Sequence, residues 1–257
     1  MENSKPFLLY PFNCRKEIFM RLNQYIASCG ICSRREADKI IDAGRVMVNG
    51  EPASFGMQIE DGDEVFIDGK RINKKKESIV LAYYKPVGVV CTEKDSHAEK
   101  TVIDDIKYPE RVTYAGRLDK DSEGLLILSN DGNLINAMMK SANKHEKEYE
   151  VTVDGKISGD FLNRMANGVY LKELDQTTRG CKIKKTGASS FNIILTQGLN
   201  RQIRRMCEAL GQKVIKLKRI RVMTVKLCDY DLKPGKYVEL DETDKKKLYK
   251  AAGLNIH

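Results

Sequence analysis

Apolar positions near the start of the chain recur at helical spacing. The segment Leu22–Cys29 predicts a short helix that Gly30 ends. Ser33 and Glu36 have the three-residue spacing of a capping box, which predicts the start of a second helix. The apolar stripe of this helix consists of Ala37, Ile40 and Ile41, and Gly44 follows as an end signal.

The pattern then changes to strands and turns. Val46–Val48 precedes Asn49-Gly50, which predicts a strand that enters a tight turn, and Glu64–Ile67 predicts another strand. We therefore expect residues 19–67 to form one small unit of two helices and a few short strands. Residues 1–18 show no clear periodicity and are treated as an N-terminal extension.

A polar segment, residues 68–78, predicts a linker to a second domain at residues 79–257. The strands expected there are 79–84, 111–115, 124–129, 149–153 and 191–195, and the helices are 134–140, 159–167 and 201–210. The strands are short and do not alternate strictly with helices. A mixed, mostly antiparallel sheet flanked by helices is therefore expected, which places the chain in the α+β class.

Charge changes this picture, because the basic residues are both numerous and clustered. The chain has 45 Lys and Arg against 36 Asp and Glu, a formal net charge of +9. Between Gln197 and Lys226 only Glu208 opposes a basic run made of Arg201, Arg204, Arg205, Lys213, Lys216, Lys218, Arg219, Arg221 and Lys226. This run predicts a surface that faces phosphates.

Cysteine usage and hydropathy indicate a cytoplasmic protein. The seven cysteines are odd in number and scattered, which makes a poor disulfide framework. Cys29 and Cys32 form a C-x-x-C pair without a second pair at zinc-ligand spacing, so packing is the preferred interpretation. No apolar run approaches the roughly 20 residues that cross a bilayer, and no membrane partner is expected.

Several common catalytic patterns are absent from the sequence. It contains no G-x-x-x-x-G-K-[ST] loop, no G-x-G-x-x-G, no G-x-S-x-G and no H-E-x-x-H. Only three histidines are present, and no cluster of acidic residues suited to a metal is obvious. A nuclease or a metal hydrolase is therefore disfavoured.

Chemistry is instead indicated at residues 116–132, GRLDKDSEGLLILSNDG. This polar loop lies between two apolar strands, so Asp119 is expected at a sheet edge beside a cleft. Taken alone, each of Asp119, Asp121 and Asp131 is more readily explained as a turn residue that bonds its own backbone. Composition and spacing do not decide between these two interpretations.

Residues 21–50, RLNQYIASCGICSRREADKIIDAGRVMVNG, closely resemble the S4 RNA-binding domain. The first turn of the second expected helix carries two arginines, where the helix dipole attracts anions. The resemblance implies that this face contacts structured RNA, although ordinary solvated charges are the alternative interpretation. The basic residues assigned to this surface are Arg21, Arg34, Arg35, Lys39 and Arg45.

The rest of the chain resembles the RsuA family of RNA pseudouridine synthases. Residues 116–132 resemble its signature, in which the Asp after Arg-Leu is catalytic. Three more segments match in order and spacing: YKPVG at 84–88, EKEYEV at 146–151, and GLNRQIRRM at 198–206. The resemblance covers about residues 20 to 240 and implies a pseudouridine synthase domain behind the S4 domain.

The implied reaction detaches uracil from its ribose, rotates it and rejoins it through carbon, without a cofactor or metal. The resemblance assigns Asp119 as nucleophile or base, while the route it follows stays open. It also implies that Tyr149 stacks on the flipped-out uracil and that Arg117 fills the vacated space. Arg204 is expected to pair with Asp119 and keep its carboxylate ionised. The two arginines expected to contact phosphates only are Arg201 and Arg205.

Residues 143–149 and 200–207 most resemble the RluF and RluB type, which implies 23S ribosomal RNA as the partner. A 16S ribosomal RNA or tRNA substrate is the alternative within the family. A non-catalytic RNA-binding or ribosome-assembly factor is a different class, and a metal-dependent RNA hydrolase is a third, which loss of activity on chelation would reveal. The non-catalytic factor is disfavoured because Asp119, Tyr149 and Arg204 are all present. A monomer is expected.

Overall fold

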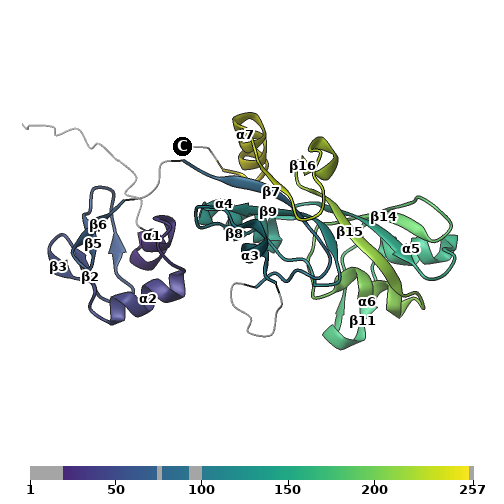
Figure 1. Cartoon of the computed structure of the whole chain (residues 1–257). Coiled ribbons are helices and arrows are strands. Elements are labelled where there is room, and N and C mark those ends of the chain that lie inside the picture. The colour runs from purple at the N-terminus through teal and green to yellow at the C-terminus, as the bar shows by residue number, and fades with distance from the viewer. Residues whose placement is uncertain (1–19, 74–76, 93–99, 255–257) are drawn as a thin grey trace, which may run out of the picture. The chain divides into compact units, whose positions relative to one another are not determined.

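A computed structural model of the chain describes residues 20–73, 77–92 and 100–254. The chain divides into two compact units, residues 1–75 and 76–257 (Figure 1). The predicted extension, residues 1–18, lies outside the described residues.

The first unit contains the two predicted helices, α1 (Leu22–Ser28) and α2 (Arg34–Asp42). Ser33 caps α2: its Oγ accepts from the backbone N–H of Glu36 at 3.2 Å, and its own N–H donates to the Glu36 carboxylate at 3.0 Å. The capping box is therefore confirmed. The apolar sides of both helices pack on the small sheet, with Leu22, Ile26, Ala37 and Ile41 in the core.

The sheet of the first unit has the order β3-β2-β5-β6, formed by β3 (Glu51–Pro52), β2 (Val46–Val48), β5 (Val65–Ile67) and β6 (Lys70–Ile72). A separate pair joins β1 (Met20–Arg21) to β4 (Gln58–Ile59). Strand β6 lies within the segment expected to be a polar linker, so that expectation is wrong for residues 70–72. Lys70 and Arg71 are exposed, and only Ile72 is buried, which leaves little apolar signal.

The second unit is built on a large sheet of order β13-β14-β10-β15-β9-β7-β17. Its strands are β7 (Val80–Lys85), β9 (Glu123–Ser129), β10 (Lys147–Val153), β13 (Lys182–Lys185), β14 (Ser190–Leu195), β15 (Val214–Val222) and β17 (Tyr237–Glu239). Two short strands, β8 (Thr113–Tyr114) and β16 (Val225–Lys226), pair with β9 and β15. Only the β9–β15 pairing in this sheet is parallel. The predicted mixed, mostly antiparallel α+β architecture is confirmed.

Helices cover both faces of this sheet (Figure 1). They are α3 (Val102–Ile106), α4 (Gly132–Met139), α5 (Gly159–Asn167), α6 (Gln202–Ala209) and α7 (Glu242–Ala251). Strand β7 shows why both faces are apolar: Val80 and Ala82 pack with Leu134 of α4 and Leu248 of α7, whereas Leu81 packs with α3 on the other face. A third core cluster lies under α5 and α6. A short hairpin, β11 (Tyr170–Leu171) and β12 (Gln176–Thr177), follows α5.

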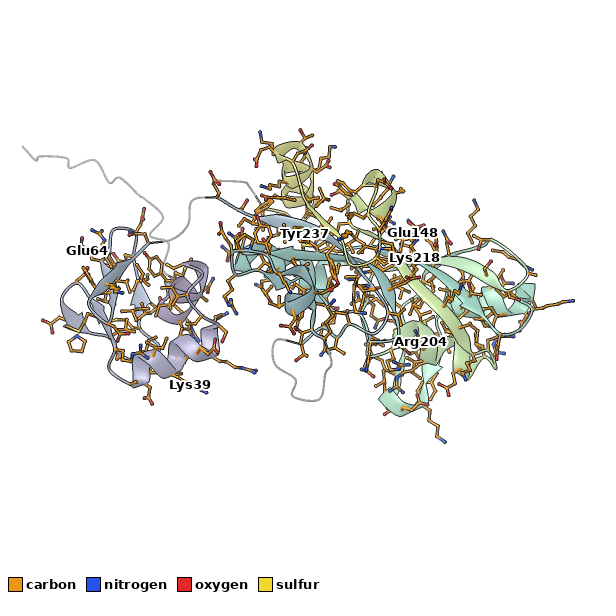
Figure 2. All side chains as sticks on the ribbon, in the orientation of Figure 1. Lys39, Glu64, Glu148, Arg204, Lys218 and Tyr237 are labelled. Carbon is orange, nitrogen blue, oxygen red and sulfur yellow. The ribbon has the colours of Figure 1, made fainter. Side chains whose placement is uncertain are left out.

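Strand β15 accounts for much of the basic run and was not predicted as a strand. Its charges face an acidic neighbour: Glu148 pairs in register with Arg221, and Glu150 with Lys218 (Figure 2). Arg221 donates to the carboxylates of Glu148 at 2.9 Å and Glu146 at 3.0 Å, and Arg219 is only 1% exposed. The expectation that the whole run faces phosphates is therefore wrong for Arg219 and Arg221.

Candidate active site

The loop that carries Asp119 joins β8 to β9. Leu118 is buried and anchors the loop in the core, and the Ser122 N–H closes a turn on the Asp119 carbonyl at 3.1 Å. The side chain of Asp119 stays 35% exposed. A short polar loop held between two buried segments thus leaves the Asp119 carboxylate partly exposed, as it does that of Asp121.

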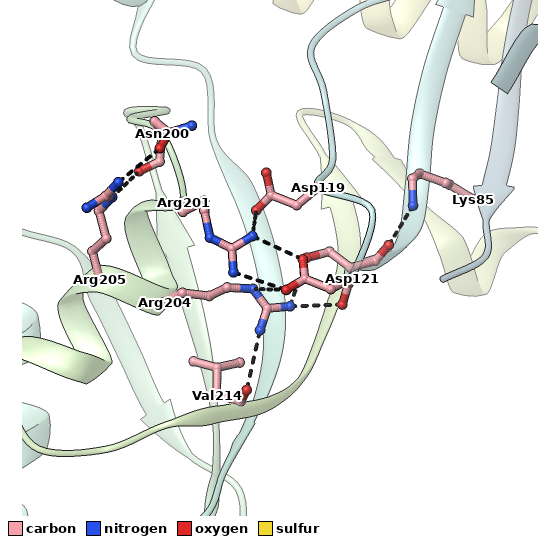
Figure 3. Close-up of polar contacts among 9 residues, drawn as sticks. Lys85, Asp119, Asp121, Asn200, Arg201, Arg204, Arg205 and Val214 are labelled. Atoms are coloured by element: carbon pink, nitrogen blue, oxygen red, sulfur yellow. Dashed lines mark hydrogen bonds and ion pairs between the residues drawn. The ribbon is translucent and has the colours of Figure 1, made fainter. Parts of the chain in front are cut away.

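Two arginines at the start of α6, Arg201 just before the helix and Arg204 within it, contact this loop (Figure 3). Arg201 lies 3.6 Å from the Asp119 carboxylate and 3.0 Å from that of Asp121. It can reach both because it precedes α6 in a left-handed conformation, with φ of 50°. The ion pair with Asp119, which was expected from Arg204, is made by Arg201.

Arg204 is held elsewhere on the same loop. It donates to the Asp121 carbonyl at 2.9 Å and the Ser122 hydroxyl at 3.1 Å, and its Nε lies 3.4 Å from the Asp121 carboxylate. A further bond to the Val214 carbonyl at 3.3 Å fixes the guanidinium between loop and β15. These backbone partners explain why Arg204 supports the loop instead of pairing with Asp119.

The electrostatics of the loop are dominated by these guanidinium groups. Burial raises the pKa of Asp121, but the hydrogen bond from Arg201 and the charges of Arg204 and Arg201 outweigh it, so the pKa lies below its ordinary value. Burial lowers the pKa of Arg204. The loop therefore keeps Asp121 ionised as a partner of both arginines, which leaves Asp119 with a single ion-pair contact.

A pocket of about 640 Å³ lies beside the loop, a volume suited to a nucleotide-sized ligand. Asp119 and Arg117 line it from the loop, and Tyr149 lines it from β10. Tyr149 is partly buried and packs on the cores of both halves of the sheet. The structure thus brings Asp119, Arg117, Tyr149 and Arg201 together around one pocket.

Four further basic or imidazole side chains line the pocket without having been predicted from the sequence, Lys140, His145, Lys147 and Arg179, and Arg219 of the basic run lines it as well. Burial lowers the pKa of His145, and the positive charge of Lys147 lowers it further. Burial lowers the pKa of Lys147, and the charge of Arg219 adds to this effect. His145 and Lys147 lie in the segment, residues 143–149, that resembles the family, and alternation along β10 places Lys147 on the same face as Tyr149; the sequence gave no such signal for Arg179.

Lys85 lies beneath the loop and is fully buried. Its ammonium donates to the carbonyls of Pro86 at 2.9 Å and Ser122 at 2.8 Å. Burial lowers its pKa to about 8. The Gly88 N–H donates to the Lys120 carbonyl at 2.8 Å, so the segment after β7 supports the loop at two points.

Arg205 contacts residues around the start of α6 and does not line the pocket. It donates to the Asn200 carbonyl at 3.1 Å and the Asn200 side chain at 3.2 Å, and pairs with Glu173 at 3.2 Å. These contacts tie the start of α6 to the segment between β11 and β12. The side chain is partly buried, and it does not line the pocket.

The basic residues expected to bind RNA in the first unit are exposed. Arg34, Arg35 and Lys39 project from α2, and Arg21 precedes α1. Arg45 is exposed too, but its guanidinium makes a paired contact with the Asp68 carboxylate. No group of three or more potential metal ligands occurs in the described ranges, and no helix within them is long and apolar enough to span a membrane.

Comparison with known proteins identifies the family. Residues 79–209, which include the Asp119 loop, β10 and all of α6, match the family model described as RNA pseudouridylate synthase. The chain belongs to this family. Residues 20–65 match the S4 domain, so the synthase domain follows an RNA-binding domain as predicted.

The synthase resembles curated relatives over most of its length. It is 44% identical to the dual-specificity RNA pseudouridine synthase RluF of Escherichia coli (strain K12), over 90% of this chain and 79% of that protein. It is 36% identical to the ribosomal large subunit pseudouridine synthase B of Bacillus subtilis (strain 168), over 77% of this chain and 84% of that protein. The predicted relation to the RluF and RluB type is confirmed.

A solved structure supports the same assignment. A crystal structure of a pseudouridylate synthase matches with a TM-score of 0.66 and 29% identity, covering 89% of this chain and 99% of that one. The protein is therefore an enzyme, a pseudouridine synthase that isomerises uridine in RNA.

Proposed function

We propose that the synthase flips one uridine out of a structured RNA into the pocket beside Asp119, and that Asp119 acts there as nucleophile or base. The observation that carries the proposal is the placement of the Asp119 carboxylate in the pocket wall, 3.6 Å from Arg201 and in one cavity with Tyr149. An aspartate held by a cation and facing a nucleotide-sized pocket can reach the sugar or the base.

The other side chains act by binding and orienting. Tyr149 offers a ring face to the extruded uracil, and such stacking contributes about 1–3 kcal/mol, which offsets unstacking in the RNA. Arg117 is exposed on the pocket rim and can occupy the space that the base leaves. Arg201 orients Asp119, and Arg204 fixes the loop behind it. The glycosidic bond broken at nitrogen is replaced by one at carbon, so no cofactor is consumed.

We propose 23S ribosomal RNA as the substrate. The support is the likeness to relatives that are named as large-subunit synthases and to the dual-specificity RluF. The exposed face of the S4 domain, Arg34, Arg35 and Lys39 with Arg21 and Arg45, would hold phosphates of the same RNA. We further propose that the enzyme works as a monomer in the cytoplasm.

The test is pseudouridine mapping on 23S, 16S and tRNA transcripts, which carry no modification before incubation with the protein. A new pseudouridine in 23S RNA supports the whole proposal. Conversion confined to 16S RNA or tRNA would contradict the substrate and keep the reaction. Tight RNA binding without any pseudouridine would contradict the catalytic role of Asp119 and leave an RNA-binding factor.

A further inference from the structure

Arg219 is a buried cation at the centre of the catalytic sheet. It lies on β15, is 1% exposed, and pairs in register with Tyr149 on β10 and with Gly124 on β9. A Cβ at Gly124 would stand 2.3 Å from the Arg219 carbonyl oxygen, so the two backbones approach each other closely there. Arg219 is thus placed directly beside the end of the loop that carries Asp119.

The guanidinium of Arg219 bonds both ends of that loop. Its Nε donates to the Leu125 carbonyl at 2.7 Å, and its Nη1 donates to the Arg117 carbonyl at 3.3 Å. Asp119 lies between these two positions in the chain. Lys85 and Arg204 hold carbonyls in the middle of the loop, and among the side chains that the structure describes Arg219 is the one that bonds both of its ends.

Burying the Arg219 guanidinium costs free energy that an apolar side chain at the same position would not. In the parts of the chain that the structure describes, no carboxylate pairs with its guanidinium, and Nη2 is buried without a hydrogen-bond partner. Burying a cation without a counter-charge costs free energy, and a well-packed apolar side chain of similar volume is often as stable or more so. The residue is therefore better explained by what it positions.

We propose that Arg219 is the positioning residue of the catalytic loop, fixing the distance between Arg117 and Leu125 and thereby the placement of the Asp119 carboxylate in the pocket. This inference rests on the proposed role of Asp119. Arg219 lines the pocket but is only 1% exposed, so we expect it to act on the chemical step through the loop and not on binding of the RNA backbone.

The first experiment separates the chemical step from RNA binding. Arg219→Lys and Arg219→Met are compared with wild type in single-turnover pseudouridine formation at saturating RNA, well below the unfolding temperature, with RNA affinity measured separately. Lysine carries its donors on a single nitrogen, whereas Arg219 reaches the two carbonyls from two different nitrogens, Nε and Nη1. We therefore expect a rate loss of about tenfold to a hundredfold, larger for methionine, with the RNA Kd unchanged within about twofold. Rates within about threefold of wild type for both variants, or a loss of affinity equal to the loss of rate, would overturn the proposal.

Lys245→Met is the matched control. Lys245 is also a buried cation of this domain, but its ion-pair partners are Glu239 and Glu242 near α7. We expect this variant to be destabilised and to keep the wild-type rate per folded molecule. An equal rate loss in Lys245→Met would show that any buried charge matters, and would overturn the specific role of Arg219.

A second readout does not depend on activity. Hydrogen exchange of the peptide spanning residues 117–125 should be faster in Arg219→Lys than in wild type and Lys245→Met; equal exchange would overturn the positioning role of Arg219. If wild type converts no RNA, the proposed function fails, while this exchange result still tests the positioning role. Should both variants fail to fold, exchange of the Arg219 Nε–H in wild type is measured: slow exchange supports the positioning role, and exchange as fast as that of exposed arginines contradicts it.

Discussion

The buried lysine under the catalytic loop makes a stability prediction with a definite sign. Lys85 is fully buried, and its ammonium bonds two backbone carbonyls without a carboxylate partner within the described residues. Burial lowers its pKa from 10.5 to about 8, with the charge of Arg219 adding to the lowering. Replacing it in Lys85→Met removes the titrating group and keeps a side chain of similar length.

The direction follows from which state holds the proton. Below about pH 8 Lys85 is charged in both states, and the folded state bears the full penalty of the buried charge. Between about pH 8 and pH 10.5 the folded state releases a proton that the unfolded chain still holds, so the unfolding free energy rises with pH. The difference in pKa corresponds to about 3 kcal/mol across that window.

The assay is urea unfolding of wild type and Lys85→Met, followed by circular dichroism at several values between pH 7 and pH 10.5. Tyrosines and surface lysines titrate in both proteins and cancel in the difference. We expect the unfolding free energy of wild type to gain up to about 3 kcal/mol relative to the variant as the pH rises. A difference that stays constant with pH, or that falls, would refute the assignment of a buried charged lysine.

Three further predictions concern RNA binding, base stacking and the sheet. Arg34→Gln combined with Arg35→Gln should weaken RNA binding and reduce the slope of log K against log salt by roughly one to two; an unchanged slope in a filter-binding titration would contradict phosphate contact. Tyr149→Ala should lose about 1–3 kcal/mol of substrate interaction in single-turnover titrations, and Tyr149→Phe should retain the stacking share; equal losses would contradict stacking. Gly124→Ala should destabilise by at least about 2 kcal/mol in urea unfolding, because its Cβ would meet the Arg219 carbonyl at 2.3 Å; a change near zero would contradict the close approach.

The elements with local signals were predictable from the sequence. The capping box at Ser33 and the apolar stripe of α2 depend on neighbours three or four residues apart, and both occur as expected. Helix α5 has the expected bounds, Gly159–Asn167, because Ser158 caps it and Gly168 ends it. Such features need no knowledge of distant parts of the chain.

Strand β15 was missed for the opposite reason. Its Arg221 is paired with Glu148 on β10 and with Glu146 just before that strand, some seventy residues earlier, so the sequence around it gave no sign of the pairing. Read locally, Arg219 and Arg221 are free cations. Only the sheet shows that one is buried and the other paired.

The site was predictable as a set of residues and not as a set of contacts. Asp119, Tyr149 and Arg117 line one pocket, and the roles that the family resemblance implies for them stay predictions. Arg204 was predicted to be the ion-pair partner of Asp119, whereas the partner is Arg201. The two arginines are only three positions apart, so the sequence does not show which guanidinium faces the carboxylate. That choice depends on the left-handed backbone at Arg201 and on the carbonyls that hold Arg204, which the sequence does not display.

The most direct test of the account compares wild type, Asp119→Asn and Asp231→Asn in single-turnover conversion of the RNA that mapping identifies. Asp231 is exposed and lies outside the loop and the pocket. The account predicts that Asp119→Asn binds the RNA and forms no pseudouridine, while Asp231→Asn converts at the wild-type rate. Conversion by Asp119→Asn at a rate close to that of wild type would contradict the central claim that this carboxylate carries the chemistry.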